Sequence, residues 1–241
     1  MLTSYMLILF RKIKRLLNPG SSDWLYRDGP FSRFFGLDRG NAIDRQFIES
    51  FLKMEESVIT GDVLEIGCDE YTYRYGTNLS NTVIFAGQAS SSRSKCFPGG
   101  DLTNSDTFPA EKMQFDCIIA TNVLNFIFEK EKAIRGLSQL IKPSGGFVLV
   151  TVAGLCQISR FDYERWGDYW RFTDTSIRKL FGQYFENVEV KTHGNAPLAA
   201  AMIMGLAKED VPLKLFDTED PDFQIVISVK AWMPKKSSCE N

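Results

Sequence analysis

The sequence predicts an α/β domain with a mostly parallel sheet and helices on both faces. Val63, Leu64 and Ile66 form a short apolar run, which is typical of a strand buried on both faces. Similar runs occur at 83–87 and 147–152, and an amphipathic stretch precedes the last of them. Because such sheets bind ligands where their strands end, the break at Gly67 marks the expected binding edge.

Composition limits the classes of function. At 241 residues, 44% of them hydrophobic, the chain is long enough to bury one full core. Its formal net charge of −2 gives no basic excess that would recruit nucleic acid. The five cysteines include no Cys-x-x-Cys pair and His193 is the only histidine, so we expect neither a disulfide framework nor a metal site. This cysteine usage favours a cytoplasmic location.

Residues 1–20 differ from the rest in composition and predict a basic amphipathic helix that ends near the Asn-Pro-Gly at 18–20. The stretch is too short to span a bilayer, and no acid precedes Asp23. We expect either adsorption of residues 1–18 to the anionic inner face of a membrane or packing of this helix on the domain. The apolar positions are Met6, Leu9, Phe10, Ile13, Leu16 and Leu17, and the basic ones are Arg11, Lys12, Lys14 and Arg15.

The rest of the chain divides into an aromatic segment at 21–40, a main domain at 41–234 and a tail at 235–241. The aromatic segment is irregular, which suits a lid or a packing segment. Asn41 is the expected N-cap of a helix with an apolar stripe over 43–52. No helix is predicted between the first two strands. The later elements expected are a strand from 115 that runs into a loop, a helix at 130–141, the strand at 147–152, a helix capped by Thr173 with its apolar face extending to Phe185, a strand at 188–192, a helix at 198–207 and a closing strand at 223–232.

Two motifs resemble class I S-adenosylmethionine-dependent methyltransferases. The Val-Leu-Glu-Ile-Gly at 63–67 is similar to their first signature, an acid followed by glycines at every second position, although Asp69 and Tyr71 replace the later glycines. The strand, helix, Lys-Pro-x-Gly-Gly turn and strand at 115–152 resemble their fourth and fifth strands. The resemblance implies a Rossmann-like fold with a seven-stranded, mostly parallel sheet, helices on both faces and S-adenosylmethionine as the methyl donor.

The motifs at 39–45, 157–162 and 165–173 narrow the resemblance to one bacterial branch of these enzymes. That branch often occurs beside or fused to glycosyltransferases of cell-surface polysaccharide assembly, and there the incomplete first signature is normal. The resemblance covers 33–234 and implies O-methylation of a saccharide or a lipid-linked saccharide.

The resemblance also implies a donor site at the strand ends. Its residues would come from the loop after the first strand, from the end of the second strand, from a turn beside adenine and from the end of the fourth strand. Gln88 offers only a neutral amide to the ribose. The predicted cofactor residues are Glu65, Gly67, Cys68, Asp69, Tyr71, Gln88, Asp101, Leu102 and Asn122.

On the acceptor side we expect Asn125, Trp170 and Arg171 to contact the substrate, with His193 or Asp168 as the catalytic base. Histidine is the side chain whose ordinary pKa suits a base near neutral pH. Two alternatives stay open, because Asp168 and Arg171 would also form a structural ion pair and a single histidine at a strand end is often only exposed.

Two other functions compete with the enzyme. A non-catalytic methyltransferase-like scaffold is favoured by the missing glycines and Gln88, whereas Glu65, Asp101 and Asn122 oppose it. A nucleotide-sugar enzyme on a related fold is disfavoured because the sequence lacks both the three-glycine dinucleotide fingerprint and a Tyr-x-x-x-Lys pair.

Overall fold

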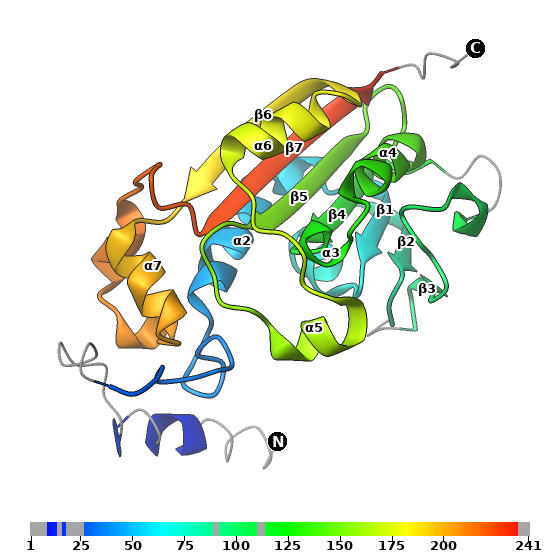
Figure 1. Cartoon of the computed structure of the whole chain (residues 1–241). Coiled ribbons are helices and arrows are strands. Elements are labelled where there is room, and N and C mark those ends of the chain that lie inside the picture. The colour runs from blue at the N-terminus through cyan, green and yellow to red at the C-terminus, as the bar shows by residue number, and fades with distance from the viewer. Residues whose placement is uncertain (1–8, 14–15, 18–26, 89–91, 110–113, 236–241) are drawn as a thin grey trace.

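A computed structural model of the chain describes residues 9–13, 16–17, 27–88, 92–109 and 114–235. They form one seven-stranded sheet in the order β3-β2-β1-β4-β5-β7-β6 (Figure 1), which confirms the predicted fold class. The strands from β3 to β5 are parallel, and β7 pairs antiparallel with both β5 and β6. The strands are β1 Gly61–Ile66, β2 Leu79–Phe85, β3 Lys95–Phe97, β4 Cys117–Thr121, β5 Phe147–Ala153, β6 Phe185–His193 and β7 Val226–Pro234.

Helices cover both faces of the sheet because its central strands are apolar on both sides. Leu64 contributes to the core beneath α4 and α6, while its neighbour Val63 contributes to the core beneath α2 and α7. Both side chains are fully buried, as the apolar run at 63–66 predicts. The helices are α2 Ile43–Met54, α3 Glu70–Tyr75, α4 Lys130–Leu140, α5 Arg160–Trp166, α6 Asp174–Phe181 and α7 Ala196–Ile203, and short 3₁₀ turns lie at Glu56–Val58, Ser105–Thr107, Leu124–Phe126, Lys208–Asp210 and Leu213–Asp217.

Several local predictions are wrong. Asn41 does not cap α2, because its side-chain amide donates to Glu209 Oε1 at 2.7 Å and Ala42 takes the N-cap position. A short helix, α3, lies between the first two strands, where none was predicted, and the strand β3 was also missed. The Thr173 cap is confirmed, but α6 ends at Phe181 because the following residues turn into β6.

Residues 27–40 contain no regular element and pack along the end of the sheet near α7. The Phe31 backbone N–H donates to the Met204 carbonyl at 2.7 Å, and the buried Arg39 pairs with Asp210, with 2.7 Å between Nε and Oδ2. The segment is thus anchored at both ends, and the residues between these anchors form one wall of the site described below. Residues 21–26 and 236–241 of the predicted segment and tail lie outside the described residues.

The described part of the N-terminal stretch, residues 9–13 and 16–17, is helical. Its apolar side chains are exposed, from 46% at Ile13 to 80% at Leu17. No helix in the described part of the chain is long and apolar enough to cross a membrane.

Candidate functional site

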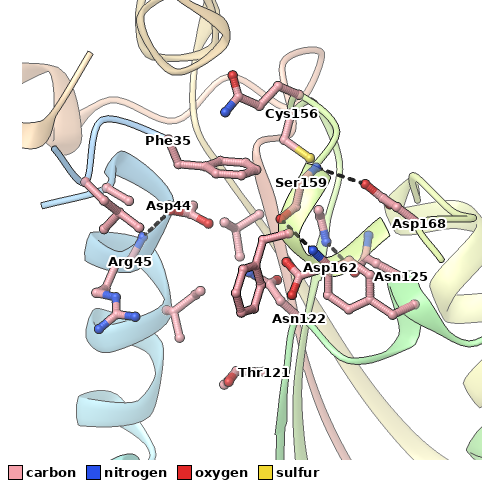
Figure 2. A pocket seen from close by; sticks show the side chains of 18 of the residues that line it. Phe35, Asp44, Arg45, Thr121, Asn122, Asn125, Cys156, Ser159, Asp162 and Asp168 are labelled. Atoms are coloured by element: carbon pink, nitrogen blue, oxygen red, sulfur yellow. Dashed lines mark hydrogen bonds between the residues drawn. The ribbon is translucent and has the colours of Figure 1, made fainter. Parts of the chain in front are cut away.

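A cavity of about 580 Å³ opens at the carboxyl ends of β1, β4 and β5, the edge where the sequence predicts the ligand. Its walls come from the start of α2, the loop after β1, the loop after β4, residues 33–37 and residues 156–162. Figure 2 shows Asp44 reaching in from α2, with Asn122 from the end of β4 and Ser159 and Asp162 from the segment after β5. Segments far apart in the chain therefore meet at one hollow.

Glu65 shapes this edge from beneath rather than lining it. Its Oε2 accepts from the Thr72 backbone N–H at 2.8 Å and from the Thr72 hydroxyl at 2.7 Å, and its Oε1 accepts from the Tyr71 N–H at 3.2 Å. These donors lie in the first turn of α3, where backbone N–H groups lack helical partners. Burial raises the pKa of Glu65 to about 7, against the lowering effect of these donors. Glu65, the acid of the first signature, therefore stabilises the N-terminus of α3.

The ends of β1 and β2 are joined by backbone contacts at two glycines. The Gly67 carbonyl accepts from the Gln88 N–H at 3.1 Å, and a Cβ on Gly87 would lie 2.0 Å from that carbonyl oxygen. Gly67 has a φ of +91°, and a Cβ there would meet nothing within 4 Å. Gly87 is therefore required for the close approach of the two loops, while Gly67 faces open space.

Asp44 and Asn122 form the polar centre of the cavity. Asp44 Oδ1 accepts from the Arg45 backbone N–H at 2.9 Å, and the neighbouring Asn122 side chain favours the ionised form of the same carboxylate. Burial raises the pKa of Asp44 above its ordinary value, and no residue of the described part forms an ion pair with it. Asn122 has a φ of +52°, and its buried Oδ1 accepts no hydrogen bond from the described residues. The cavity thus presents one buried acceptor without a donor, Asn122 Oδ1, beside a carboxylate without an ion pair among the described residues.

Asn125 holds three loops of the acceptor side together. Its Nδ2 donates to the Trp170 carbonyl at 2.8 Å, its Oδ1 accepts from the Ala153 N–H at 3.2 Å, and its own carbonyl accepts from the Tyr169 N–H at 2.9 Å. The side chain is 2% exposed, so these bonds form away from solvent. Asn125 lines the cavity but is occupied by structural bonds.

Asp168 and Arg171 also line the cavity and form the ion pair that the structural alternative predicts. Arg171 Nη2 lies 2.8 Å from Asp168 Oδ2, and that oxygen also accepts from the Ser159 N–H at 3.2 Å. Asp168 is therefore surrounded by donors, which leaves it a poor candidate for the base.

His193 does not reach the cavity. It is 4% exposed, its Nε2 lies 2.8 Å from Ser228 Oγ, its Nδ1 lies 3.3 Å from Glu219, and its ring stacks on Phe47. Burial lowers its pKa, which Glu219 opposes. Because β7 is inserted between β5 and β6, His193 ends a strand three places from β4, roughly 14 Å across the sheet. Its position gives no support to a catalytic role.

Of the predicted site residues, the structure brings six to the cavity: Cys68, Tyr71, Asn122, Asn125, Asp168 and Arg171. Asp69 is fully buried and accepts from Ser94 Oγ at 2.6 Å, and the Trp170 indole donates to the Ile127 carbonyl at 3.0 Å. The predicted residues that do not line it are Glu65, Gly67, Asp69, Gln88, Asp101, Leu102, Trp170 and His193.

The two residues predicted beside adenine have other contacts. The Asp101 carboxylate accepts from both the backbone N–H and the hydroxyl of Thr103 at 2.8 Å. Leu102 is 3% exposed and belongs to the core beneath α4. Gln88 is exposed, and the residues that follow it lie outside the described part of the chain.

Sequence reasoning missed Asp44, Asp162 and the aromatic wall formed by Phe34, Phe35 and Phe161. For Asp44 a signal was present, because it follows Ile43 at the start of the helix that runs antiparallel to β1. A helix in that position begins at the carboxyl edge of the sheet, so its first turn faces the ligand side. Asp162 ends the motif at 157–162, but nothing in that motif predicts where its side chain lies.

No family model matches the sequence, nor does any curated protein. Among solved structures, phosphoethanolamine N-methyltransferase 2 from Haemonchus contortus, in complex with S-adenosylhomocysteine, is similar with a TM-score of 0.51 and 14% identity over 88% of this chain and 56% of that chain. This chain therefore spans about half the length of that enzyme. N-methyltransferase NodS from Bradyrhizobium japonicum WM9 has a TM-score of 0.47 and 14% identity over 92% of this chain and 97% of that chain. The chain thus has the Rossmann-like fold of class I S-adenosylmethionine-dependent methyltransferases.

Proposed function

We propose that the protein is an S-adenosylmethionine-dependent methyltransferase. The observation that carries this proposal is the buried Asn122 Oδ1, which accepts no hydrogen bond from the described residues, beside the Asp44 carboxylate, which has no ion pair among them. Buried acceptors without donors are costly, so a ligand that supplies N–H groups and positive charge is favoured there. The donor carries both an ammonium group and a positively charged sulfonium.

The residues at the strand ends fit this group. Asp44 and Asn122 would hold its ammonium end, and the open space before Gly67 would admit its approach to the backbone. Once bound, the donor supplies an activated methyl carbon for in-line displacement by a nucleophile. The protein must then orient the acceptor, exclude water and, for a hydroxyl acceptor, remove a proton.

We propose an oxygen of a saccharide or lipid-linked saccharide as the methyl acceptor, which rests on the resemblance of residues 157–173 and on the cavity wall. Aromatic and hydrogen-bonding side chains alternate there, as sugar rings require. Asp162 is the best-placed base, because it lines the cavity and its carboxylate has no partner among the described residues.

Titration calorimetry with S-adenosylmethionine and S-adenosylhomocysteine tests the proposal. We expect binding of both, with the free energy of unfolding rising by about 2.7 kcal/mol at a hundredfold excess over the dissociation constant. No heat and no thermal shift with either compound would refute the donor assignment.

A non-catalytic scaffold is the second candidate function. It is favoured by the two residues predicted beside adenine, because Asp101 is engaged by Thr103 and Leu102 is part of the core. The same titration separates the two, since a scaffold that has lost the donor site would bind neither compound.

A further inference from the structure

The mouth of the cavity and the adjoining helix α5 with its preceding residues carry exposed apolar side chains. Phe34, Leu37 and Phe161 line the cavity and are nevertheless 67%, 42% and 61% exposed. Ile158 and Trp166, on either side of Phe161 in the chain, are 49% and 58% exposed. Single exposed apolar residues are normal, but a group around one opening marks a contact surface. We call these five residues the apolar rim.

Cationic groups accompany the rim. The Arg165 guanidinium lies 3.4 Å from the centre of the Phe161 ring, and the Arg160 guanidinium lies 5.2 Å from that of Tyr163. Arg33 and Arg160 also line the cavity. Aromatic rings and long basic side chains together are typical of surfaces that lie at the headgroup level of a membrane.

The N-terminal helix adds a second surface of the same chemistry. Phe10, Leu16 and Leu17 are 61%, 79% and 80% exposed, and the described residues 9–13 include Arg11 and Lys12. The sequence adds two more basic residues at 14–15 and no acid before position 23. In Figure 1 this helix is drawn at the same end of the molecule as α5 and residues 27–40.

We propose that the apolar rim and the N-terminal helix rest together on an anionic lipid surface, so that the cavity opens towards the bilayer. Charge favours an anionic lipid surface over a neutral protein partner, because the N-terminal stretch has four basic residues and no acid before Asp23. The two acids of α5, Asp162 and Glu164, are matched by Arg160 and Arg165. One weak membrane signal binds marginally, whereas two act together. This placement rests on the proposed function, and it implies that the methyl acceptor is a lipid-anchored saccharide that enters the cavity from the bilayer.

Vesicle co-sedimentation of the full chain without donor tests the proposal. Vesicles of phosphatidylcholine with phosphatidylglycerol should bind the protein, and pure phosphatidylcholine should bind it more weakly, by roughly fivefold for each basic residue that contacts the surface. Phe161→Ser/Trp166→Ser should lower the partition constant by about tenfold or more, because both side chains would lose apolar contact with the lipid. Arg11→Glu/Lys12→Glu should lower it through the other surface.

Met54→Ser is the matched control. Met54 is 59% exposed, as Phe161 is 61% exposed, but it ends α2 roughly 15 Å from Asp44 along the helix axis. This variant should bind vesicles as the wild type does. Circular dichroism melts identify any variant that has lost its fold, and such a variant is replaced by the single changes Phe161→Ser and Trp166→Ser.

Three results would overturn the proposal: unchanged vesicle binding by folded rim variants, equal loss with Met54→Ser, or a concentration-dependent dimer whose formation the rim variants abolish. The last would show that a second copy of the chain covers the rim. Since no donor is present in the assay, a failed titration with S-adenosylmethionine leaves the vesicle result intact.

Discussion

Replacing Asp44 by asparagine should weaken donor binding and raise the thermal stability of the donor-free protein. Ionised Asp44 is half-buried without an ion pair among the described residues, and its loss of solvent raises its pKa. Loss of a charge-assisted hydrogen bond to the donor's ammonium should cost about 1.5–3 kcal/mol, or about 10- to 150-fold in dissociation constant. The free variant should unfold at a higher temperature, because it no longer buries a charge and its new amide can donate to Asn122 Oδ1.

The pH dependence has a definite sign. A carboxyl whose folded pKa is raised stabilises the free protein below its ordinary pKa and loses that contribution as the pH rises through the folded pKa. A cation binds only the ionised form, so donor affinity should increase over the same range, and within that range donor binding should release a proton. Calorimetry in two buffers with different ionisation enthalpies measures that proton, and Asp44→Asn should abolish its release.

Asp222→Asn is the control. This substitution removes the same formal charge, but Asp222 lies in an exposed turn and does not line the cavity. It should change neither the donor affinity nor the proton count. An Asp44→Asn variant that is folded and binds S-adenosylmethionine as tightly as the wild type would refute the role assigned to Asp44, as would a stability that falls.

Four further predictions follow from the geometry. Gly87→Ala should lower the free energy of unfolding by about 1–3 kcal/mol and weaken donor binding, because the new Cβ would lie 2.0 Å from the Gly67 carbonyl oxygen. Gly99→Ala, whose Cβ would meet nothing within 4 Å, should change neither quantity. Urea titrations measure the stability and calorimetry the donor affinity. Asn125→Ala should cost about 1–3 kcal/mol of stability in the same urea titrations, because it leaves the Ala153 N–H without its acceptor and removes one of the two donors to the Trp170 carbonyl; no measurable loss would contradict that account. Asp162→Asn should lower turnover by more than about tenfold at unchanged donor affinity, and near-normal turnover would remove it as the base. For Glu65, whose pKa is raised from 4.5 to about 7, stability should fall by about 3 kcal/mol as the pH rises through that interval, and Glu65→Gln should flatten the dependence measured by urea unfolding.

The sheet could be predicted from sequence patterns, because burial of apolar side chains determines where its central strands lie. The apolar side chains of β1 and β5 are buried on both faces of the sheet, and the Thr173 side chain accepts from a backbone N–H only three residues away. The misses have a different origin. Asn41 is a good cap by type, but Glu209, distant in the chain, takes its amide. The short helix α3 begins where Glu65 satisfies its first N–H groups, a contact that no local propensity reveals.

The candidate site shows the same division. The edge of the sheet was predictable, because parallel strands place their carboxyl ends together, and Asn122 and Asn125 followed from that rule. The base was not predictable, because pairing order decides which strand ends are neighbours. Inserting β7 between β5 and β6 moves His193 away from the cavity, while α2 brings Asp44 to it from outside the sheet. The type of a residue is therefore a weaker predictor of a site than the strand order that positions it. For that reason, substitution of Asp44 should lower donor affinity, whereas substitution of His193 should not.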